Sequence, residues 1–179
     1  MIISIDNGRL LIRSLGIQDM DGLKAMRRDR KVYRYEPTFL LELQSAPEEA
    51  LETFRRMDLD TDRQCILGVY EKEAPSDLVG LAELYDYKPS GKVISIGYRF
   101  LSACWGRGLA TSCVRALLDY IRGHTAVELV TAHVLPDNIA SARCLLKNGF
   151  EYLLTKTEDW GDGCPRPAEV YTFDCVRKA

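Results

Sequence analysis

A short segment just past the middle of the chain has the residue types of an anion-binding turn. It reads Trp105-Gly-Arg-Gly-Leu-Ala-Thr111. Alternating apolar residues before it predict a strand, and apolar residues at helical spacing after it predict a helix. Glycine lets a ligand approach the backbone closely, and the first N–H groups of a helix have no partner inside that helix. The segment is therefore a candidate site for a phosphate group held by backbone amides.

A dinucleotide-binding fold would use a similar turn. Its pattern is Gly-x-Gly-x-x-Gly after the first strand, with an acidic residue about 20 positions further on. Here Thr111 takes the place of the third glycine, and the candidate acid is Glu128. The turn also lies far from the first expected strand. A nucleotide-dependent oxidoreductase remains an alternative, although the pattern fits it poorly.

The elements that must position this turn alternate between helices and strands. Asp19 is expected to cap a first helix, and the capping-box pattern Ser45-Ala-Pro-Glu48 precedes a second helix. Asn138 and Gly149 are expected to begin and end a short helix beyond the turn. Strands are expected at 9–13, 64–70, 78–87, 92–101, 128–134, 150–157 and 168–175. The strands 64–70, 78–87 and 92–101 should form a meander, with turns at 74–77 and 88–91 between them. The strands 150–157 and 168–175 should form a hairpin.

Length and composition favour one soluble domain over residues 1–179. With 46% hydrophobic and 28% charged residues, the chain can bury a core of its own. A formal charge of −2 without a basic stripe gives no footprint for nucleic acid. The sequence has neither a signal peptide nor an apolar stretch of about 18 residues, so a cytoplasmic protein without membrane contact is expected.

The cysteines and histidines lack the spacing of metal or disulfide sites. The six cysteines include no Cys-x-x-Cys pair and lie mostly in apolar periodic segments, so they are expected to be reduced core residues. His124 and His133 are too few and too poorly spaced for a metal site, and a structural role is expected for each. No metal is expected.

Five further motifs accompany the turn in a fixed order. They are Arg9-Leu-Leu-Ile-Arg13, Leu78-Val-Gly80, Ile96-Gly-Tyr98, Pro136-Asp-Asn-Ile-Ala-Ser141 and Asn148-Gly-Phe150. Together these motifs resemble the GNAT superfamily of N-acetyltransferases, in particular the branch that acts on ribosomal-protein N-termini. The family's pyrophosphate loop usually begins with Gln or Arg, where this chain has Trp105. A tryptophan at this place is common in the branch named.

The resemblance implies an α/β fold of the α+β type. Its mixed, mostly antiparallel twisted sheet is flanked by helices, and two parallel central strands, here 92–101 and 128–134, splay apart around the pantetheine arm of acetyl-CoA. A buried amide without a strand partner is costly unless a ligand satisfies it. The family's cofactor contacts would fall on Phe100 and Leu101 for pantetheine, Arg107, Gly108, Ala110 and Thr111 for pyrophosphate, and Asn138 and Ser141 for the arm and the sulfur.

The activity implied is direct attack of a primary amine on the acetyl-CoA thioester, with no covalent enzyme intermediate. This reaction needs a base for the ammonium, a donor to the carbonyl oxygen and a proton for the thiolate. The resemblance gives the last role to Ser141 and the second to a backbone amide near Phe100 or Leu101. Glu158 and Glu83 are the candidate bases, and the sequence leaves that choice open.

The acceptor would be a protein N-terminus or a small-molecule amine. Its recognition is expected in Tyr33-Arg34-Tyr35-Glu36 and in the loop at 158–167, because these segments vary within the family. Assembly of two copies of the chain into a homodimer is left open. A non-catalytic acyl-CoA-binding or sensing module stays open as an alternative function.

Overall fold

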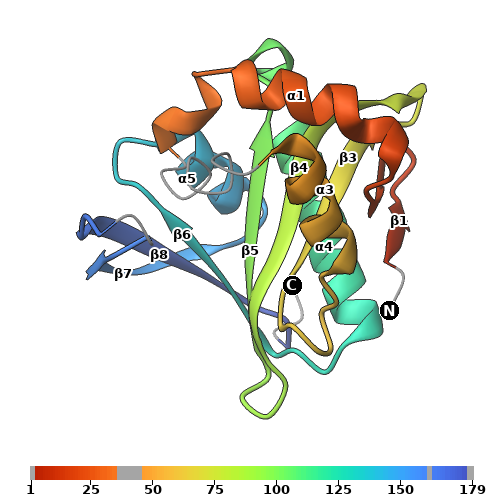
Figure 1. Ribbon diagram of the computed structural model, residues 1–179. Coiled ribbons are helices and arrows are strands. Elements are labelled where there is room, and N and C mark those ends of the chain that lie inside the picture. Colours follow the sequence, from red (N-terminus) through yellow and green to blue (C-terminus); the bar gives the residue numbers. More distant parts are fainter. Residues whose placement is uncertain (1–2, 36–45, 161–162, 177–179) are drawn as a thin grey trace.

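A single mixed sheet organises the protein. The computed structural model describes residues 3–35, 46–160 and 163–176, and in this part of the chain eight strands pair in the order β1-β2-β3-β4-β5-β6-β8-β7 (Figure 1). All neighbours are antiparallel except β5 and β6, which are parallel. The strands are β1 (Ser4–Asp6), β2 (Leu10–Ser14), β3 (Cys65–Glu71), β4 (Ala74–Lys88), β5 (Val93–Phe100), β6 (Leu129–Val134), β7 (Glu151–Glu158) and β8 (Arg166–Asp174).

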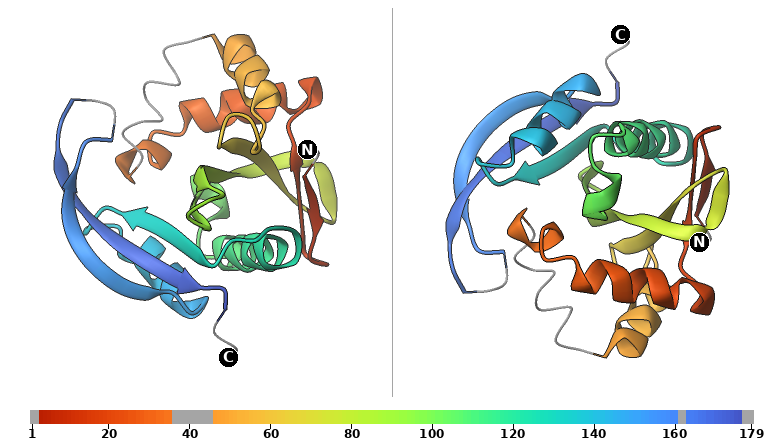
Figure 2. Two further views of the ribbon diagram at one scale, coloured as in Figure 1. Left: turned by 90° about the horizontal axis from the view of Figure 1, so that it is seen from below. Right: turned by 90° about the horizontal axis from the view of Figure 1, so that it is seen from above.

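Helices cover both faces of this sheet, as the expected α+β fold requires. Helices α1 and α3 lie on one face, and α4 and α5 lie on the other (Figure 2). No helix among the described residues is long and apolar enough to cross a membrane. The helices are α1 (Met20–Arg28), α3 (Pro47–Arg56), α4 (Leu109–His124) and α5 (Ile139–Lys147), with 3₁₀ turns η1 (Ile17–Asp19), η2 (Val32–Tyr35) and η3 (Ser102–Cys104).

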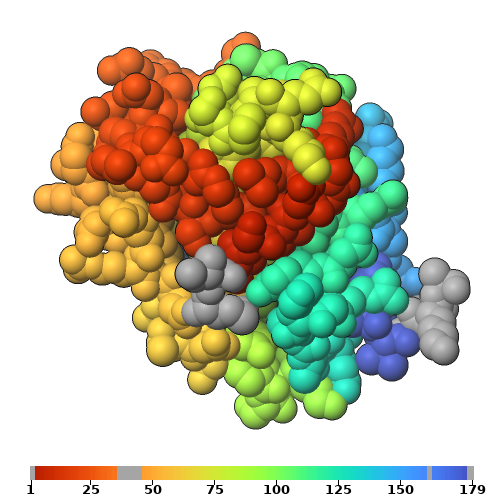
Figure 3. Space-filling view, turned by 90° about the vertical axis from the view of Figure 1, so that its right-hand side faces the viewer, coloured from red at the N-terminus to blue at the C-terminus, as the bar shows by residue number. Residues whose placement is uncertain are grey.

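The hairpin β1–β2 forms one edge of the sheet. The N-terminal part of the chain, drawn in red, lies on the face of the molecule shown in Figure 3. Only the second strand of this hairpin was expected from the sequence, because the three residues of β1 are too few to show an alternation. The Asn7 side chain joins this hairpin to α4, donating to the carbonyl oxygen of Ser112 at 3.1 Å. A second difference concerns 74–77, expected as a turn. These residues belong to β4, and Ala74 pairs with Glu71 beyond a bulge.

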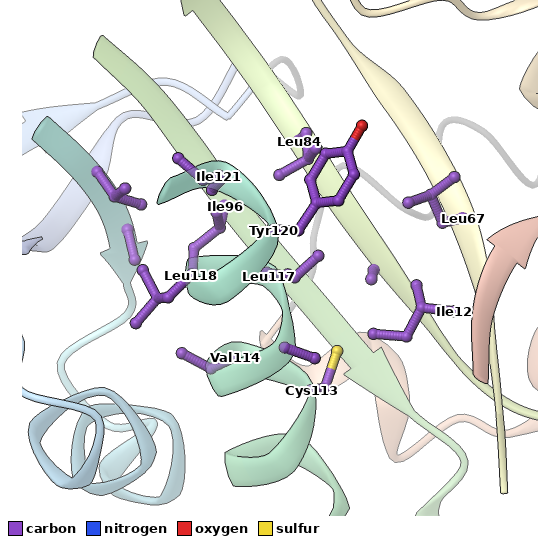
Figure 4. Close-up of a cluster of buried hydrophobic side chains, with 14 of the residues drawn as sticks. Ile12, Leu67, Leu84, Ile96, Cys113, Val114, Leu117, Leu118, Tyr120 and Ile121 are labelled. Carbon is purple, nitrogen blue, oxygen red and sulfur yellow. The ribbon is translucent and has the colours of Figure 1, made fainter. Parts of the chain in front are cut away.

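Helix α4 is the central element of the larger core cluster. Its apolar side chains recur along one face and pack against β3, β4 and β5 (Figure 4). Cys113 and Leu117, on this face of the helix, are fully buried. A fully buried leucine contributes about 1.5 to 3 kcal/mol to folding. This packing fixes the N-terminus of α4 relative to the end of β5. A second cluster lies under α1 and α3.

The two expected caps near the N-terminus differ in detail from the structure. Asp19 precedes α1 but makes no side-chain cap bond to it. Its buried carboxylate instead accepts from the Gly16 N–H at 2.7 Å and pairs with Arg13 at 3.1 Å. For α3, the carboxylate of Glu49 accepts from the Ala46 N–H at 3.3 Å. The acceptor in the capping box is thus Glu49 and not the expected Glu48, one residue earlier. Ser45, the expected first residue of the box, lies outside the described residues.

The parallel strands β5 and β6 separate after three paired positions. Val93, Ile94 and Ser95 pair with 129–131, and the remaining residues of each strand have no register partner in the other. The strands lie together at one end and diverge toward the other (Figure 1). At the last paired position the Ser95 and Thr131 hydroxyls hydrogen-bond at 2.7 Å. This is the expected splayed pair, and it opens the sheet at its centre.

Candidate functional site

A cleft of about 820 Å³ occupies the opening between β5 and β6. Its volume lies within the range of small-molecule and cofactor sites. The cleft reaches both faces of the sheet, because its lining includes residues of β4, β5 and β6, the turn before α4, the helix α5 and the end of β7. One continuous site is therefore available to two ligands that meet in the sheet.

The glycine turn forms the wall of the cleft at the N-terminus of α4. Gly106 and Gly108 have φ values of 77° and 74°, a left-handed backbone that favours glycine. Gly108 is the N-cap of α4, no side chain caps the helix, and its first turn carries no acidic residue. Gly108, Ala110 and Thr111 line the cleft. The free N–H groups and the helix dipole make this end of the cleft suitable for an anion.

The expected phosphate ligand Arg107 points elsewhere. Its guanidinium pairs with Glu71 at 2.7 Å, and Arg107 does not line the cleft. The Arg107 carbonyl accepts a hydrogen bond of 2.6 Å from Arg9, which fixes the turn to β2. Two other cations, Arg143 and Lys147 of α5, line the cleft. Neither of these two cations was identified from the sequence.

The backbone of β5 presents polar groups to the opening. The Leu101 N–H donates to the Val79 carbonyl at 3.0 Å, so this amide serves the sheet. Hydrogen-bonded positions alternate along an antiparallel pair. The backbone groups of Tyr98 and Phe100 therefore face away from β4 and toward the cleft. The Phe100 carbonyl also accepts from the Trp105 indole at 2.8 Å, which gives the unusual tryptophan a local role.

Asn138 and Ser141 come together at the start of α5. The Asn138 side chain accepts from the Ser141 N–H at 3.2 Å, as expected of an N-cap. The Ser141 hydroxyl lies 2.9 Å from the hydroxyl of Tyr98, a partner that the sequence analysis did not identify. Burial raises the pKa of Tyr98 well above its ordinary value, so the phenol stays protonated at neutral pH.

Cys144 completes this group of polar side chains on the α4 and α5 face. Burial raises the pKa of its thiol, and both Tyr98 and Thr111 contact it. A protonated, buried thiol is a poor nucleophile. Cys144 is therefore a packing residue, in line with a reaction that needs no nucleophilic cysteine.

Glu83 lies on the opposite face and is held by a buried cation. Its carboxylate pairs with the guanidinium of Arg99, whose side chain is 3% exposed. The two residues come from adjacent strands, with Glu83 across from Gly97 and Arg99 two positions further on. Glu83 lines the cleft, but it also provides the counter-ion for a buried guanidinium.

Glu158 lies on the same face at the end of β7. Its Oε2 is 2.9 Å from His133 Nδ1, and its Oε1 is 3.2 Å from Lys156 Nζ. Glu158 and His133 both line the cleft. Burial lowers the pKa of His133, an effect that Glu158 opposes. The structure thus places beside a candidate base a histidine for which the sequence analysis expected only a structural role.

The expected acceptor segments contribute to this face only in part. Tyr35 lines the cleft, as do Asp159 and Trp160 from the loop after β7. The Tyr33 hydroxyl instead donates to the Met26 carbonyl at the end of α1 at 3.0 Å. Glu36 and residues 161–162 lie outside the described residues.

Comparison with known proteins assigns the family. Residues 9–151 match the model of the acetyltransferase (GNAT) domain. The chain belongs to this family of N-acetyltransferases. This assignment removes the dinucleotide-dependent oxidoreductase from consideration, and it agrees with the eight-stranded, mostly antiparallel sheet and its one parallel pair.

One sequence relative and two solved structures of the same fold are similar to this chain. The uncharacterized N-acetyltransferase YoaA of Bacillus subtilis is 24% identical over 94% of this chain and 95% of its own length. The structure of RimL, a ribosomal L7/L12 alpha-N-protein acetyltransferase in complex with coenzyme A, has a TM-score of 0.77 at 16% identity, over 97% of this chain and 98% of RimL. The Vibrio cholerae spermidine N-acetyltransferase in complex with CoA and spermine has a TM-score of 0.75 at 18% identity, over 94% of this chain and 96% of that protein.

The described residues of this GNAT domain offer no set of side chains that could bind a metal ion. Within residues 3–35, 46–160 and 163–176, no group of three or more His, Cys, Asp or Glu side chains is arranged to hold a metal ion. All six cysteines are free thiols, of which Cys65, Cys113 and Cys144 are buried.

The Glu83–Arg99 pair predicts a loss of stability that must be separated from any loss of activity. Replacing Glu83 by Gln removes the negative charge beside a buried guanidinium, and a hydrogen bond to a charged group contributes about 1.5 to 3 kcal/mol. We expect the free energy of unfolding of Glu83→Gln, measured by urea denaturation, to fall by about this amount. Glu73→Gln, an exposed change between β3 and β4, is the matched control. Equal stability of both variants would show that the pair contributes nothing.

Proposed function

We propose that this GNAT enzyme transfers the acetyl group of acetyl-CoA directly to a primary amine, either a protein N-terminus or a small-molecule amine. This proposal rests on the opened strand pair β5–β6, which lies beside the uncapped N-terminus of α4. Acetyl-CoA matches both features: its polar amide arm suits the opened strands, and its pyrophosphate suits the helix N-terminus. Acetyl-CoA is the co-substrate, and no metal takes part.

The cofactor enters from the α4 and α5 face. Backbone amides at Gly108, Ala110 and Thr111 hold its pyrophosphate, because the first N–H groups of α4 have no partner within the helix. Arg107 contributes through its backbone, since its side chain pairs with Glu71. Arg143 adds positive charge from α5.

The pantetheine arm lies in the opening between β5 and β6. Its amides pair with the backbone groups at Phe100 and Tyr98 that face the opening, and with the side chain of Asn138. The Phe100 N–H is better placed than Leu101 to donate to the carbonyl oxygen as negative charge develops there, because the Leu101 N–H is bonded to Val79.

Ser141 supplies the proton for the leaving thiolate. Its hydroxyl lies on the cofactor face of the cleft and hydrogen-bonds to Tyr98. A phenol with a raised pKa donates to the serine oxygen without ionising itself. The serine proton is then free to point toward the sulfur.

The acceptor binds on the α1 and α3 face, opposite the cofactor. Glu83, Glu158 and Asp159 line this side, with the guanidinium of Arg99 paired to Glu83. Such a lining attracts a cationic amine. Glu158 and Glu83 are the carboxylates that sequence reasoning assigned to the base. RimL has been solved in complex with coenzyme A, and the spermidine enzyme in complex with CoA and spermine; both complexes support this class of reaction.

A turnover screen tests the reaction itself. Purified protein is incubated with acetyl-CoA and a library of amines and N-terminal peptides, and free thiol is measured. Turnover with any amine supports the proposal. Acetyl-CoA binding without turnover or hydrolysis across the library would instead favour an acyl-CoA-binding or sensing module.

The pyrophosphate site predicts a charge-specific loss of cofactor affinity at Ala110. This residue lies in the first turn of α4 and lines the cleft. Ala110→Glu places a negative charge against the phosphates, whereas Ala110→Gln adds nearly the same bulk without charge. An acidic residue in a first turn stabilises the helix, so the fold is retained.

We expect the dissociation constant for acetyl-CoA, measured by calorimetry, to be at least about tenfold higher for Ala110→Glu than for Ala110→Gln. Raising the salt concentration should narrow this difference, because the repulsion is screened. Equal affinities of the two variants at low salt would place the pyrophosphate elsewhere.

The role of Ser141 predicts a loss of rate without a loss of binding. We expect Ser141→Ala to lower kcat by about tenfold to a few hundredfold with little change in acetyl-CoA affinity, because the hydroxyl acts mainly in the transition state. Tyr98→Phe should lower kcat by a smaller factor, since Ser141 keeps its own proton. Wild-type turnover by Ser141→Ala would remove this residue from the mechanism.

A further inference from the structure

His133 stands at the edge of the opening in the sheet. It follows Thr131, the last residue of β6 to pair with β5, by two positions. Its neighbours Ala132 and Val134 belong to the core cluster under α4, so the alternation of β6 directs His133 to the α1 and α3 face. Continued pairing would have placed it level with Gly97, which lies across from Glu83. His133 therefore faces the side on which the acceptor binds.

Glu158 is already engaged by two partners. Oε2 contacts His133 Nδ1 at 2.9 Å and Oε1 contacts Lys156 Nζ at 3.2 Å. A proton taken by this carboxylate would weaken one of these contacts. Glu83 is likewise engaged, by the buried guanidinium of Arg99. Both carboxylates that sequence reasoning favoured are thus held as counter-ions.

His133 lines the cleft and contacts Glu158 through Nδ1, at 2.9 Å from Oε2, an oxygen that has no well-aligned hydrogen-bond partner among the described residues. When the neutral ring carries its proton on Nδ1, beside the carboxylate, its lone pair is on Nε2, at the far side of the ring. Burial lowers the pKa of His133; Lys156 lowers it further, and Glu158 and Asp86 oppose the shift. The ring is therefore neutral at pH 7. Only 15% of the His133 side chain is exposed, and it lines the cleft.

We infer that His133 is the general base that takes the proton of the acceptor amine, and that Glu158 is a positioning residue that orients the imidazole. This inference deepens the proposed acetyl transfer and rests on it. The arrangement of base and orienting carboxylate follows the logic of a catalytic triad without its nucleophile, because the amine itself attacks.

Two protons leave the nitrogen of the acceptor in this step. The ammonium transfers the first to His133 Nε2, and the free amine attacks the thioester carbon. The C–N bond forms and the C–S bond breaks; the Ser141 hydroxyl gives its proton to the leaving thiolate and its oxygen takes the second proton of the nitrogen. The first proton then leaves His133 for solvent. Glu158 stabilises the imidazolium while it exists.

The first test compares His133→Asn with His124→Asn. The carboxamide of asparagine can still contact Glu158 but lacks a basic nitrogen, and His124 lies exposed near the end of α4 against Tyr120. We expect His133→Asn to lower kcat by about 10²- to 10³-fold at pH 7 with unchanged acetyl-CoA affinity. His124→Asn should behave as wild type. Turnover of His133→Asn within about twofold of wild type overturns the inference.

The pH profile separates His133 from Glu158. In the wild type, kcat should rise with pH through a pKa below the ordinary histidine value of about 6.5, because only the neutral ring accepts a proton. Glu158→Gln should keep this rise of kcat but shift it to lower pH, since the carboxylate that raises the pKa of His133 is gone. His133→Asn should show no such rise. If Glu158→Gln loses the rise and His133→Asn keeps it, Glu158 is the base.

A measurement on the protein without substrate keeps this inference distinct from the proposed function. The chain has only two histidines, so NMR ring-proton signals are assigned with His124→Asn and followed against pH. The pKa of His133 should lie below the ordinary histidine value of about 6.5 and fall further in Glu158→Gln. If the pKa of His133 is unchanged in Glu158→Gln, Glu158 does not position His133, and the inference is overturned even if acetyl transfer is found. Absence of acetyl-CoA binding in the wild type would instead overturn the proposed function.

Discussion

The separation of β5 from β6 is the constraint on which the rest of the molecule depends. A central pair of strands that parts after Ser95 and Thr131 leaves backbone amides facing an opening instead of a neighbouring strand. Such groups are costly to bury unless a ligand satisfies them. The fold supports the opening from outside: α4 packs across β3, β4 and β5, and the hydroxyl pair of Ser95 and Thr131 closes the last joined position. The hydrogen-bond ladder of the sheet is thus interrupted at its centre, between β5 and β6.

The opening also divides the chemistry between the two faces of the sheet. Residues that alternate along β5 point in turn to the cofactor face, as Tyr98 does, and to the acceptor face, as Arg99 does. In the mechanism that we propose, Tyr98 and Ser141 donate a proton to sulfur from one side of the sheet. His133 and Glu158 accept a proton from the amine on the other side. The pleat of the strands would then keep the acid and the base apart, with the thioester carbon between them.

Local patterns in the sequence predicted most helices and strands and the glycine turn before α4, because those features depend on neighbouring residues. Helical periodicity, the glycine turn and the Asn138 cap are each contained in a few consecutive positions. The details that depend on register were not predictable in this way. Arg99 meets Glu83 only because β4 and β5 pair in one particular alignment. The strand β8 lies between β6 and β7, so no pattern within either strand indicates that Glu158 reaches His133.

The arginines of the opening motif show how a sequence resemblance and a physical role can differ. Arg9 and Arg13 belong to the pattern that indicated the family, yet neither lines the cleft. Arg9 holds the carbonyl of Arg107 and thereby the glycine turn, and Arg13 neutralises the buried Asp19, which in turn fixes the approach to α1. A buried carboxylate without such a partner would destabilise the fold. Neither arginine touches the cleft itself: Arg9 holds the turn before α4, whose first residues line the cleft, and Arg13 holds the segment before α1 on the opposite face of the sheet.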